Sequence, residues 1–294
     1  MMQTDCQSHE MVPPVSLWQL AWGKLKKNRA ALVSAILLLV IIFAVVSGPG
    51  LNSHDSETVN FNMISQPPAF SEGYWFGTDT LGRDLYSRTL SGGRISLAVG
   101  MVATLVSIVI GVSYGAISGY MGGRVDAVMM RLVDILYALP FMFFVILLMV
   151  VFGRSIYLIF IAIGAVNWLD MARIVRGETL SLKEKEFVLA ARIMGVSHLA
   201  IIYRHIVPNL LGVVIVYITL TIPQVILVES FLSFLGLGIQ EPQTSWGALV
   251  NQGVQQMESA PWELFFPGIF LTLTLLCFNF LGDGLRDALD PKQR

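Results

Sequence analysis

The most informative pattern in the chain is a set of apolar residues that recur at i, i+3, i+4 and i+7: Phe187, Ala190, Ala191 and Met194. This spacing predicts one face of a short helix, on which small alanine side chains let another surface approach the backbone closely. Gly195 can end such a helix in the left-handed conformation, and Pro208 suits the first turn of a following helix. The chemistry expected of this 187–208 segment is contact with a partner.

Two interpretations of the 187–208 segment follow from its residues. The segment belongs to the most basic stretch of a very hydrophobic chain and lies between two apolar runs long enough to cross a bilayer. It can present its small-residue face to a cytoplasmic protein, or it can be an amphipathic connector on the anionic inner leaflet. The residues alone leave both interpretations open.

A second set of residues with informative spacing precedes the second apolar run: Gly77, Thr78, Asp79, Gly82, Arg83 and Asp84. Asp79 and Asp84 lie on either side of Arg83 and can form a salt-bridged turn, while the two glycines allow positive φ angles. Such a turn can order the chain before the apolar run, or it can be a docking surface for an external protein. Both roles are compatible with the sequence.

Sequence patterns for nucleotide or metal binding are absent. No Gly-x-x-x-x-Gly-Lys-[Ser/Thr] stretch occurs, so we expect no nucleotide bound through a P-loop. The 4 histidines lack ligand spacing with carboxylates or cysteines, and the 2 cysteines offer no disulfide framework. We therefore expect a chain with no catalytic residues, no metal and no cofactor of its own.

The composition is that of a membrane protein. Hydrophobic residues make up 55% of the chain and charged residues only 13%, whereas about 25% of residues are charged in soluble domains. A span needs about 20 apolar residues, and its backbone groups must be satisfied internally in lipid, which favours helices. Six spans are predicted: 30–48, 95–121, 135–153, 155–173, 206–228 and 264–282. We predict an all-α polytopic membrane protein with six transmembrane helices.

The basic residues predict the orientation of these spans. With the N-terminus in the cytoplasm, fifteen of the 19 lysines and arginines lie on the inner side, and the four others lie outside: Arg83, Arg88, Arg94 and Arg154. Because cytoplasmic loops carry the excess of Lys and Arg, we expect both termini in the cytoplasm. The first apolar run starts near Ala30, too late for a cleavable signal peptide, and is expected to stay as an anchor.

The middles of the predicted spans contain no charged residue. Carriers driven by protons or sodium ions usually need an ionisable residue there, so the pattern argues against an ion-coupled secondary carrier. A membrane receptor or scaffold that transports nothing is a further alternative. Uptake that requires ATP would indicate an ATP-driven transporter, and uptake that follows a proton gradient would indicate a secondary carrier. A receptor or scaffold would accumulate no substrate.

The 187–208 segment resembles the Glu-Ala-Ala loop of type-I ABC-importer permeases. Ala190, Ala191, Gly195 and Pro208 match the pattern of that loop, whereas Leu189 occupies the position of its glutamate. The departure puts in doubt any polar contact that the family's glutamate makes with its ATPase.

Other segments are similar to one group within that family. Residues 76–84 and 281–291 resemble signatures of the peptide and nickel permeases. Residues 141–148, 168–177 and 229–238 look like the C-type subunit of oligopeptide permeases rather than that of dipeptide permeases.

This resemblance implies a type-I ABC-importer permease fold and a division of the chain into five parts. These are a cytoplasmic segment 1–29, a transmembrane helix 30–48, a periplasmic segment 49–93, the permease domain 94–283 and a cytoplasmic tail 284–294. It also implies that an ATPase is coupled to transport through Phe187, Leu189, Ala190, Ala191, Met194, Gly195 and Pro208.

The resemblance further implies partners and cargo. The partners are a second homologous permease subunit, two cytoplasmic ABC ATPases that bind ATP and Mg²⁺, a periplasmic peptide-binding protein and the lipid of a bacterial inner (cytoplasmic) membrane; no nucleic acid is expected. The expected cargo is oligopeptides, with dipeptides, murein peptides, nickel and antimicrobial peptides left open.

Overall fold

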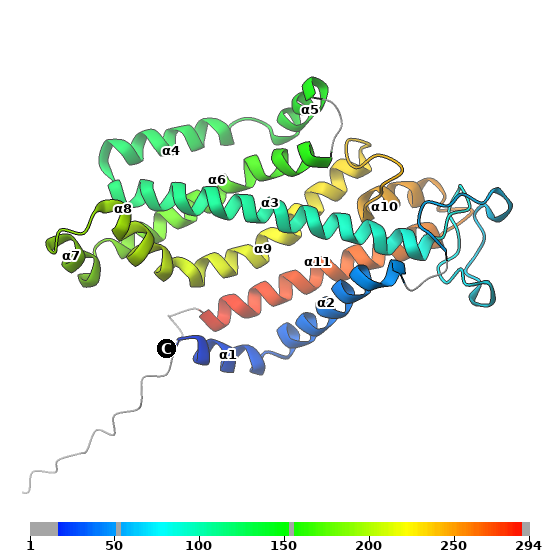
Figure 1. Ribbon diagram of the computed structural model, residues 1–294, viewed down its shortest axis with the longest axis horizontal. Helices are drawn as coiled ribbons and strands as arrows, with labels where there is room; N and C mark the ends of the chain where they lie inside the picture. The colour runs from blue at the N-terminus through cyan, green and yellow to red at the C-terminus, as the bar shows by residue number, and fades with distance from the viewer. Residues whose placement is uncertain (1–16, 51–53, 153–155, 290–294) are drawn as a thin grey trace, which may run out of the picture.

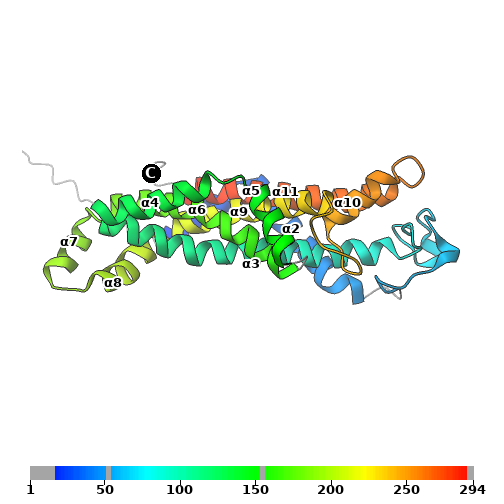
Figure 2. The ribbon, with the colours of Figure 1, turned by 90° about the horizontal axis from the view of Figure 1, so that it is seen from above.

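The computed structural model describes residues 17–50, 54–152 and 156–289. Regular structure in these residues is helical, apart from two isolated β-bridges that join Ala69 to Tyr74 and Thr78 to Asp84. Figure 1 shows long helices that run side by side along the longest axis, and Figure 2 shows that the bundle is thin when seen from above. The predicted all-α fold is confirmed.

The helices vary widely in length. They are α1 (Leu17–Lys27), α2 (Arg29–Ser47), α3 (Leu85–Met121), α4 (Gly123–Tyr137), α5 (Phe141–Phe152), α6 (Ile156–Leu182), α7 (Glu186–Ile193), α8 (His198–Ile201), the π-helical turn η4 (Ile202–Ile206), α9 (Val207–Phe234), α10 (Trp246–Gln255) and α11 (Trp262–Leu289). Parts of the predicted segments lie outside the described residues: 1–16, 51–53, 153–155 with Arg154, and 290–294.

Among the described residues, four helical stretches are long and apolar enough to cross a membrane. They are α2, α3, α11 and the continuous stretch His198–Phe234 that α8, η4 and α9 form together. The predicted spans 30–48, 95–121, 206–228 and 264–282 lie almost entirely within these stretches. The fourth predicted span falls on α6, which continues to Leu182. The polytopic architecture predicted from composition is confirmed.

The third predicted span, 135–153, is wrong as a single helix. The chain leaves the helical conformation after Tyr137 and begins α5 at Phe141, on either side of Pro140. Proline has no backbone N–H, and it disfavours the helical conformation of the residue before it, here Leu139. With 12 residues, α5 is about 18 Å long and by itself is shorter than the roughly 30 Å hydrocarbon core.

Helix α4 is fastened to α6 by ion pairs. Asp126 accepts two hydrogen bonds from Arg176, at 2.5 and 2.6 Å, and a third from Ser118 at 2.5 Å. Asp134 pairs with Arg173 at 2.9 Å. Because bidentate arginine–carboxylate pairs fix orientation as well as distance, α4 is held in register along α6.

The predicted domain boundaries at 93/94 and 283/284 fall several residues inside long helices. The boundary at 93/94 lies within α3, which begins at Leu85 because the Asp84 carboxylate caps it by accepting the Ser87 N–H at 2.9 Å. The boundary at 283/284 lies within α11, which continues because Gly284 packs against the start of α2. A Cβ on Gly284 would lie 2.4 Å from the Ala31 Cβ.

The packing of α3 against α6 depends on three glycines at i, i+4 and i+8: Gly111, Gly115 and Gly119. A Cβ on Gly115 would lie 2.4 Å from the carbonyl oxygen of Ala172, and one on Gly119 would lie 2.8 Å from that of Arg176. Small residues at this spacing let two helix backbones approach closely. This glycine stripe brings the C-terminal ends of α3 and α6 together.

Replacing Gly115 by leucine is expected to destroy this packing. The nearest atom is a backbone oxygen that no side-chain rotation can move, so the helices must separate at a cost of more than about 3 kcal/mol. We expect most of the variant to elute as aggregate in size-exclusion chromatography in detergent. Gly177→Leu on α6 is the matched control, because nothing lies within 4 Å of its added Cβ. A monodisperse Gly115→Leu protein would contradict this account.

Candidate functional site

Helix α7 presents an apolar tip to the surroundings. Ile193 is 86% exposed and Met194 is 74% exposed, and the side chains of Phe187, Leu189 and Ala190 are also exposed. Ala191 is instead buried, together with Val188. Ala191 was predicted to belong to the contact face, and this part of the prediction is wrong. The sequence pattern does not show which side of an amphipathic helix packs inward.

The inward side of α7 belongs to a hydrophobic core that several helices share. Val188 and Ala191 belong to one buried cluster with residues of α3, α6, α8, η4 and α9: Val112, Ala116, Tyr120, Met171, Val175, Ile201, Ile202, Ile206, Leu210 and Val214. A close-packed interior transmits displacement because it is hardly compressible. A force on α7 is therefore passed to the membrane-crossing helices α3 and α9.

Gly195 ends α7 as predicted. Its φ angle is +77°, the left-handed conformation. The N–H of Val196 donates to the carbonyl oxygen of Ala191 and that of Gly195 to the carbonyl oxygen of Arg192, both at 3.1 Å. These two bonds form a Schellman motif, which fixes the direction in which the chain leaves α7.

The predicted position of Pro208 is confirmed, although the helix does not begin there. Pro208 lies in the first turn of α9, directly after the π-helical turn η4. Proline cannot donate a backbone hydrogen bond, and a π turn is one way a helix accommodates such a break. The Asn209 side chain donates to the His205 carbonyl oxygen at 2.6 Å. The stretch from α8 to α9 is therefore one continuous helix.

Sequence reasoning missed two residues beneath α7. The hydroxyl of Tyr120, at the end of α3, lies 3.1 Å from the Nδ1 atom of His198 in α8. The guanidinium group of Arg192 lies over the Tyr120 ring, 5.5 Å from its centre. His198 has no ligand spacing in the sequence, and only the packing of α3 against α8 brings it to Tyr120.

At the opposite end of α3 from α7, the predicted turn is buried. Thr78, Asp79, Arg83 and Asp84 are each at most 4% exposed, and Gly77 and Gly82 are buried as well. Both glycines have the predicted positive φ angles, +81° and +71°. A Cβ on Gly82 would lie 1.9 Å from the carbonyl oxygen of Asn60. Because these side chains are covered, the geometry favours the role of ordering the chain before α3.

The predicted salt bridge of Arg83 is present and belongs to a larger network. Arg83 pairs with Asp79 at 2.7 Å, and Arg88 pairs with the same carboxylate at 3.2 Å. Glu241, from the segment between α9 and α10, pairs with both arginines. We call Asp79, Arg83, Arg88 and Glu241 the outer ion-pair network. Arg88 and Glu241 were not found from the sequence, since Glu241 is 158 positions from Arg83.

The outer ion-pair network predicts a pH dependence. Burial alone would raise the pKa of the Glu241 carboxyl, but hydrogen bonding to Arg83 and the charge of Arg88 hold that pKa below its ordinary value of 4.5. A lowered folded-state pKa contributes stability that is complete above 4.5 and is lost as the pH falls through the lowered value. We therefore expect the protection of residues 76–84 against amide hydrogen exchange, relative to the intrinsic exchange rate at each pH, to fall as the pH drops below 4.5.

The control for this measurement is Glu241→Gln, which removes the charge at every pH. The protection of residues 76–84 against exchange in this variant is expected to be low already at neutral pH and to change little on acidification. Equal protection of the wild-type segment at neutral pH and at about pH 3 would contradict the role of Glu241.

A buried carboxylate lies in α9 just beyond the end of the predicted fifth span. The predicted fifth span ended at 228, but α9 continues to Phe234 and includes Glu229, which is 0% exposed. Ser96 of α3 and Ser233 of α9 donate to its two oxygens, at 3.1 and 2.7 Å. Ser245, which caps α10, lies 3.2 Å from Ser233. Glu229 thus links α3, α9 and α10.

Comparison with known proteins places the chain among transport permeases. Residues 108–294 match the family model described as binding-protein-dependent transport system inner membrane component. Residues 16–68 match the model for the N-terminal TM domain of oligopeptide transport permease C.

Individual relatives match along nearly the whole chain. The oligopeptide transport system permease protein OppC of Haemophilus influenzae is 57% identical, with 95% of this chain and 90% of the relative covered. OppC of Escherichia coli K12 is 58% identical, with 95% and 92% covered. The dipeptide transport system permease protein DppC of Bacillus subtilis is 48% identical, with 96% and 88% covered.

A solved structure supports the fold. The MetNI methionine ABC transporter in an inward-facing conformation has a chain that matches with a TM-score of 0.55 and covers 68% of this chain and 94% of its own length. The sequence identity is 17%, so this likeness concerns the fold alone.

Proposed function

Because the chain belongs to the family of binding-protein-dependent transport system inner membrane components, we propose that it is the permease subunit of an ATP-driven importer of oligopeptides in the bacterial inner membrane. The names of the relatives support oligopeptides as cargo. The match to a dipeptide permease keeps dipeptides as the second candidate.

The observation that carries the proposal is the arrangement of α7. Its exposed tip, Ile193 and Met194, offers an apolar surface to a partner, and its buried side packs onto the helices that cross the membrane. An ATPase that docks on this tip and moves during its cycle would displace α3 and α9. Such a displacement biases a helix bundle between two arrangements.

We assign ATP and Mg²⁺ to two partner ATPases, since this sequence contains no P-loop motif. The chain itself makes and breaks no covalent bond. The end of the molecule that carries α7 is assigned to the cytoplasm, with both termini on the same side, because the basic residues are concentrated there. A second, homologous permease completes the pore in this proposal.

The outer surface offers a different site for a peptide-binding protein than the sequence suggested. The residues of the buried turn are covered, whereas Phe61 and Phe70 in the same outer segment are 74% and 79% exposed. Exposed aromatic residues are common anchors of protein interfaces. We therefore assign the docking of a binding protein to the surface around these two phenylalanines, with the outer ion-pair network holding that surface in place.

The test is uptake of labelled di-, tri-, tetra- and pentapeptides by cells that lack this gene, with and without its restoration. Loss confined to the longer peptides, reversed by the gene, is the expected result. Loss of dipeptide uptake alone would favour the second candidate. Depleting ATP and, separately, collapsing the proton gradient then identifies the energy source. Uptake that follows the proton gradient would point to an ion-coupled carrier and overturn the proposal.

A further inference from the structure

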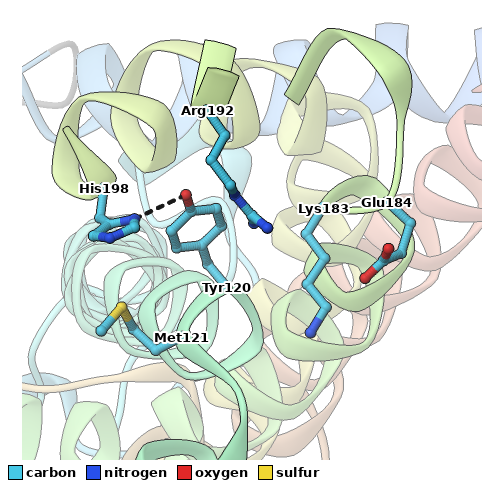
Figure 3. A pocket seen from close by; sticks show the side chains of 6 residues that line it. All are labelled: Tyr120, Met121, Lys183, Glu184, Arg192 and His198. Atoms are coloured by element: carbon cyan, nitrogen blue, oxygen red, sulfur yellow. Dashed lines mark hydrogen bonds between the residues drawn. The ribbon is translucent and has the colours of Figure 1, made fainter. Parts of the chain in front are cut away.

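A cavity of about 380 Å³ lies between the inner end of α3 and the helices α7 and α8. Its lining combines two fixed cations, an imidazole, a phenol, a thioether and one carboxylate: Lys183, Arg192, His198, Tyr120, Met121 and Glu184. Figure 3 shows Arg192 reaching from α7 to the side of the Tyr120 ring, with Lys183 and Glu184 on the neighbouring wall. Because these residues come from four separate parts of the chain, only folding creates the cavity.

The position of Arg192 is fixed by what lies beneath it. The Tyr120 ring is 5% exposed, and its hydroxyl is paired with His198. The guanidinium group lies over that ring, a favourable contact for a cation. Arg192 is exposed, but this contact holds its guanidinium group at the wall of the cavity.

The two cations of the cavity are not neutralised by the described part of this chain. No described carboxylate forms an ion pair with Lys183 or Arg192. The charge of Asp126 acts on that of Lys183, but the Asp126 carboxylate is already engaged by Arg176 and Ser118. Glu184 lies in the cavity wall but is itself exposed. The cavity thus has an excess of positive charge.

The length of α3 places this cavity beyond the lipid headgroups. Gly48, after the outer end of α2, lies against Leu90 of α3, and the 19 residues of α2 cover about 28 Å, close to the hydrocarbon thickness. Leu90 of α3 is thus level with the outer end of α2, and α3 continues past the inner end of α2. By this measure Tyr120 lies roughly 16 Å beyond that inner end. The headgroup layer is only about 5–8 Å thick on each side. A soluble partner, not a lipid, can therefore occupy the cavity.

We propose that this cavity receives an acidic side chain, aspartate or glutamate, from the ATPase that docks on α7. The inference rests on the proposed function. Arg192 is adjacent in sequence to Ile193, the most exposed apolar residue of the tip. A protein that docks on Ile193 and Met194 therefore lies close to Arg192 and the cavity that it lines. Partial removal from water strengthens the attraction between the cations and a carboxylate, and a planar guanidinium group can bind that carboxylate through two hydrogen bonds.

The experiment measures the Kd of the purified ATPase subunits for the permease complex in nanodiscs. The double variant Lys183→Gln/Arg192→Gln removes both cations of the cavity. The double variant Lys185→Gln/Arg204→Gln removes the same charge from exposed positions that do not line the cavity, one directly before α7 and one in η4. We expect the Kd to rise at least about tenfold for the cavity variant, with a weaker salt dependence, and to stay within about twofold for the control variant.

The outcomes separate this inference from the proposed function. An equal loss of ATPase affinity in the two double variants would mean that only the general positive charge of this region matters. No loss of affinity in either variant would mean that the cavity is not used. Each of these results would overturn the inference. Ala190→Glu tests docking on α7 itself. If Ala190→Glu weakens binding but the cavity variant does not, only the inference fails. If Ala190→Glu leaves the Kd unchanged, docking on α7 fails as well.

A free anion is the other occupant that the chemistry allows. Binding of radiolabelled inorganic phosphate to the permease complex without its ATPases distinguishes it. If the cavity variant no longer binds phosphate but binds the ATPase with an unchanged Kd, the inference is overturned. If the inference holds, charge reversal at Arg192→Glu is expected to weaken ATPase binding and to be rescued by an acid-to-arginine change on the ATPase.

Discussion

Replacing Gly195 by valine is expected to reduce peptide uptake about tenfold while leaving the amount of protein in the membrane nearly unchanged. The left-handed conformation at φ +77° costs an L-residue about 1–2 kcal/mol, and a β-branched residue tolerates it least. A cost near 1.4 kcal/mol corresponds to a factor of ten in an equilibrium. The valine should therefore shift α7 away from the orientation that the Schellman motif sets. Uptake and membrane content are measured in the same cells.

The expectation that the protein still folds has a structural basis. Nothing lies within 4 Å of a Cβ placed on Gly195, so the substitution creates strain without a steric clash. Gly177→Val is the control for added bulk, because that site is equally open and its φ is not in the left-handed region. Gly195→Asn is the control for conformation, because asparagine accepts the left-handed region. Normal uptake by Gly195→Val would exclude a coupling role for this turn.

Replacing Glu229 by leucine is expected to lower the thermal stability of the protein strongly. Leucine fills a comparable volume but leaves the hydroxyl groups of Ser96 and Ser233 without their acceptor. Each buried donor left unpaired costs about 1–3 kcal/mol. For a protein of this size the apparent Tm in detergent should fall on the order of 10 °C. Scanning fluorimetry of the purified variant gives the value.

Two controls make the result specific to the buried cluster. Glu229→Gln retains one acceptor oxygen and should lose clearly less stability than Glu229→Leu. Glu258→Leu removes an exposed carboxylate from the outer region and should change the stability by no more than about 0.5 kcal/mol. If all three variants melted at the wild-type temperature, Glu229 would have no role in joining α3, α9 and α10.

Local signals in the sequence were sufficient for most of the long apolar helices and for the backbone conformations of three glycines. An apolar run long enough to cross a bilayer specifies a helix whatever its neighbours are, because the backbone has no other way to satisfy its polar groups in lipid. The left-handed turn at Gly195 and the positive φ angles of Gly77 and Gly82 were also predictable, because glycine carries its conformational freedom wherever it stands.

Errors in the sequence analysis occurred where a prediction depended on neighbours distant in the chain. The third span was predicted as one helix because a count of apolar residues ignores the break at Pro140. The fifth span was ended before Glu229 because a carboxylate looks like a boundary until Ser96 of α3 and Ser233 of α9 are seen to donate hydrogen bonds to it.

The sequence by itself determined that this chain is a helical membrane protein with a short, glycine-terminated helix between two long helices. Only the tertiary structure decided that Ala191 faces inward, that Glu241 completes the outer ion-pair network, and that Tyr120 and Arg192 enclose a basic cavity. The physical reason is that helix periodicity and glycine torsions are set within a few residues, whereas burial and ion pairing are set by which helices pack together. The glycine stripe on α3 controls that packing, since it lets α6 approach the end of α3 on which the cavity is built.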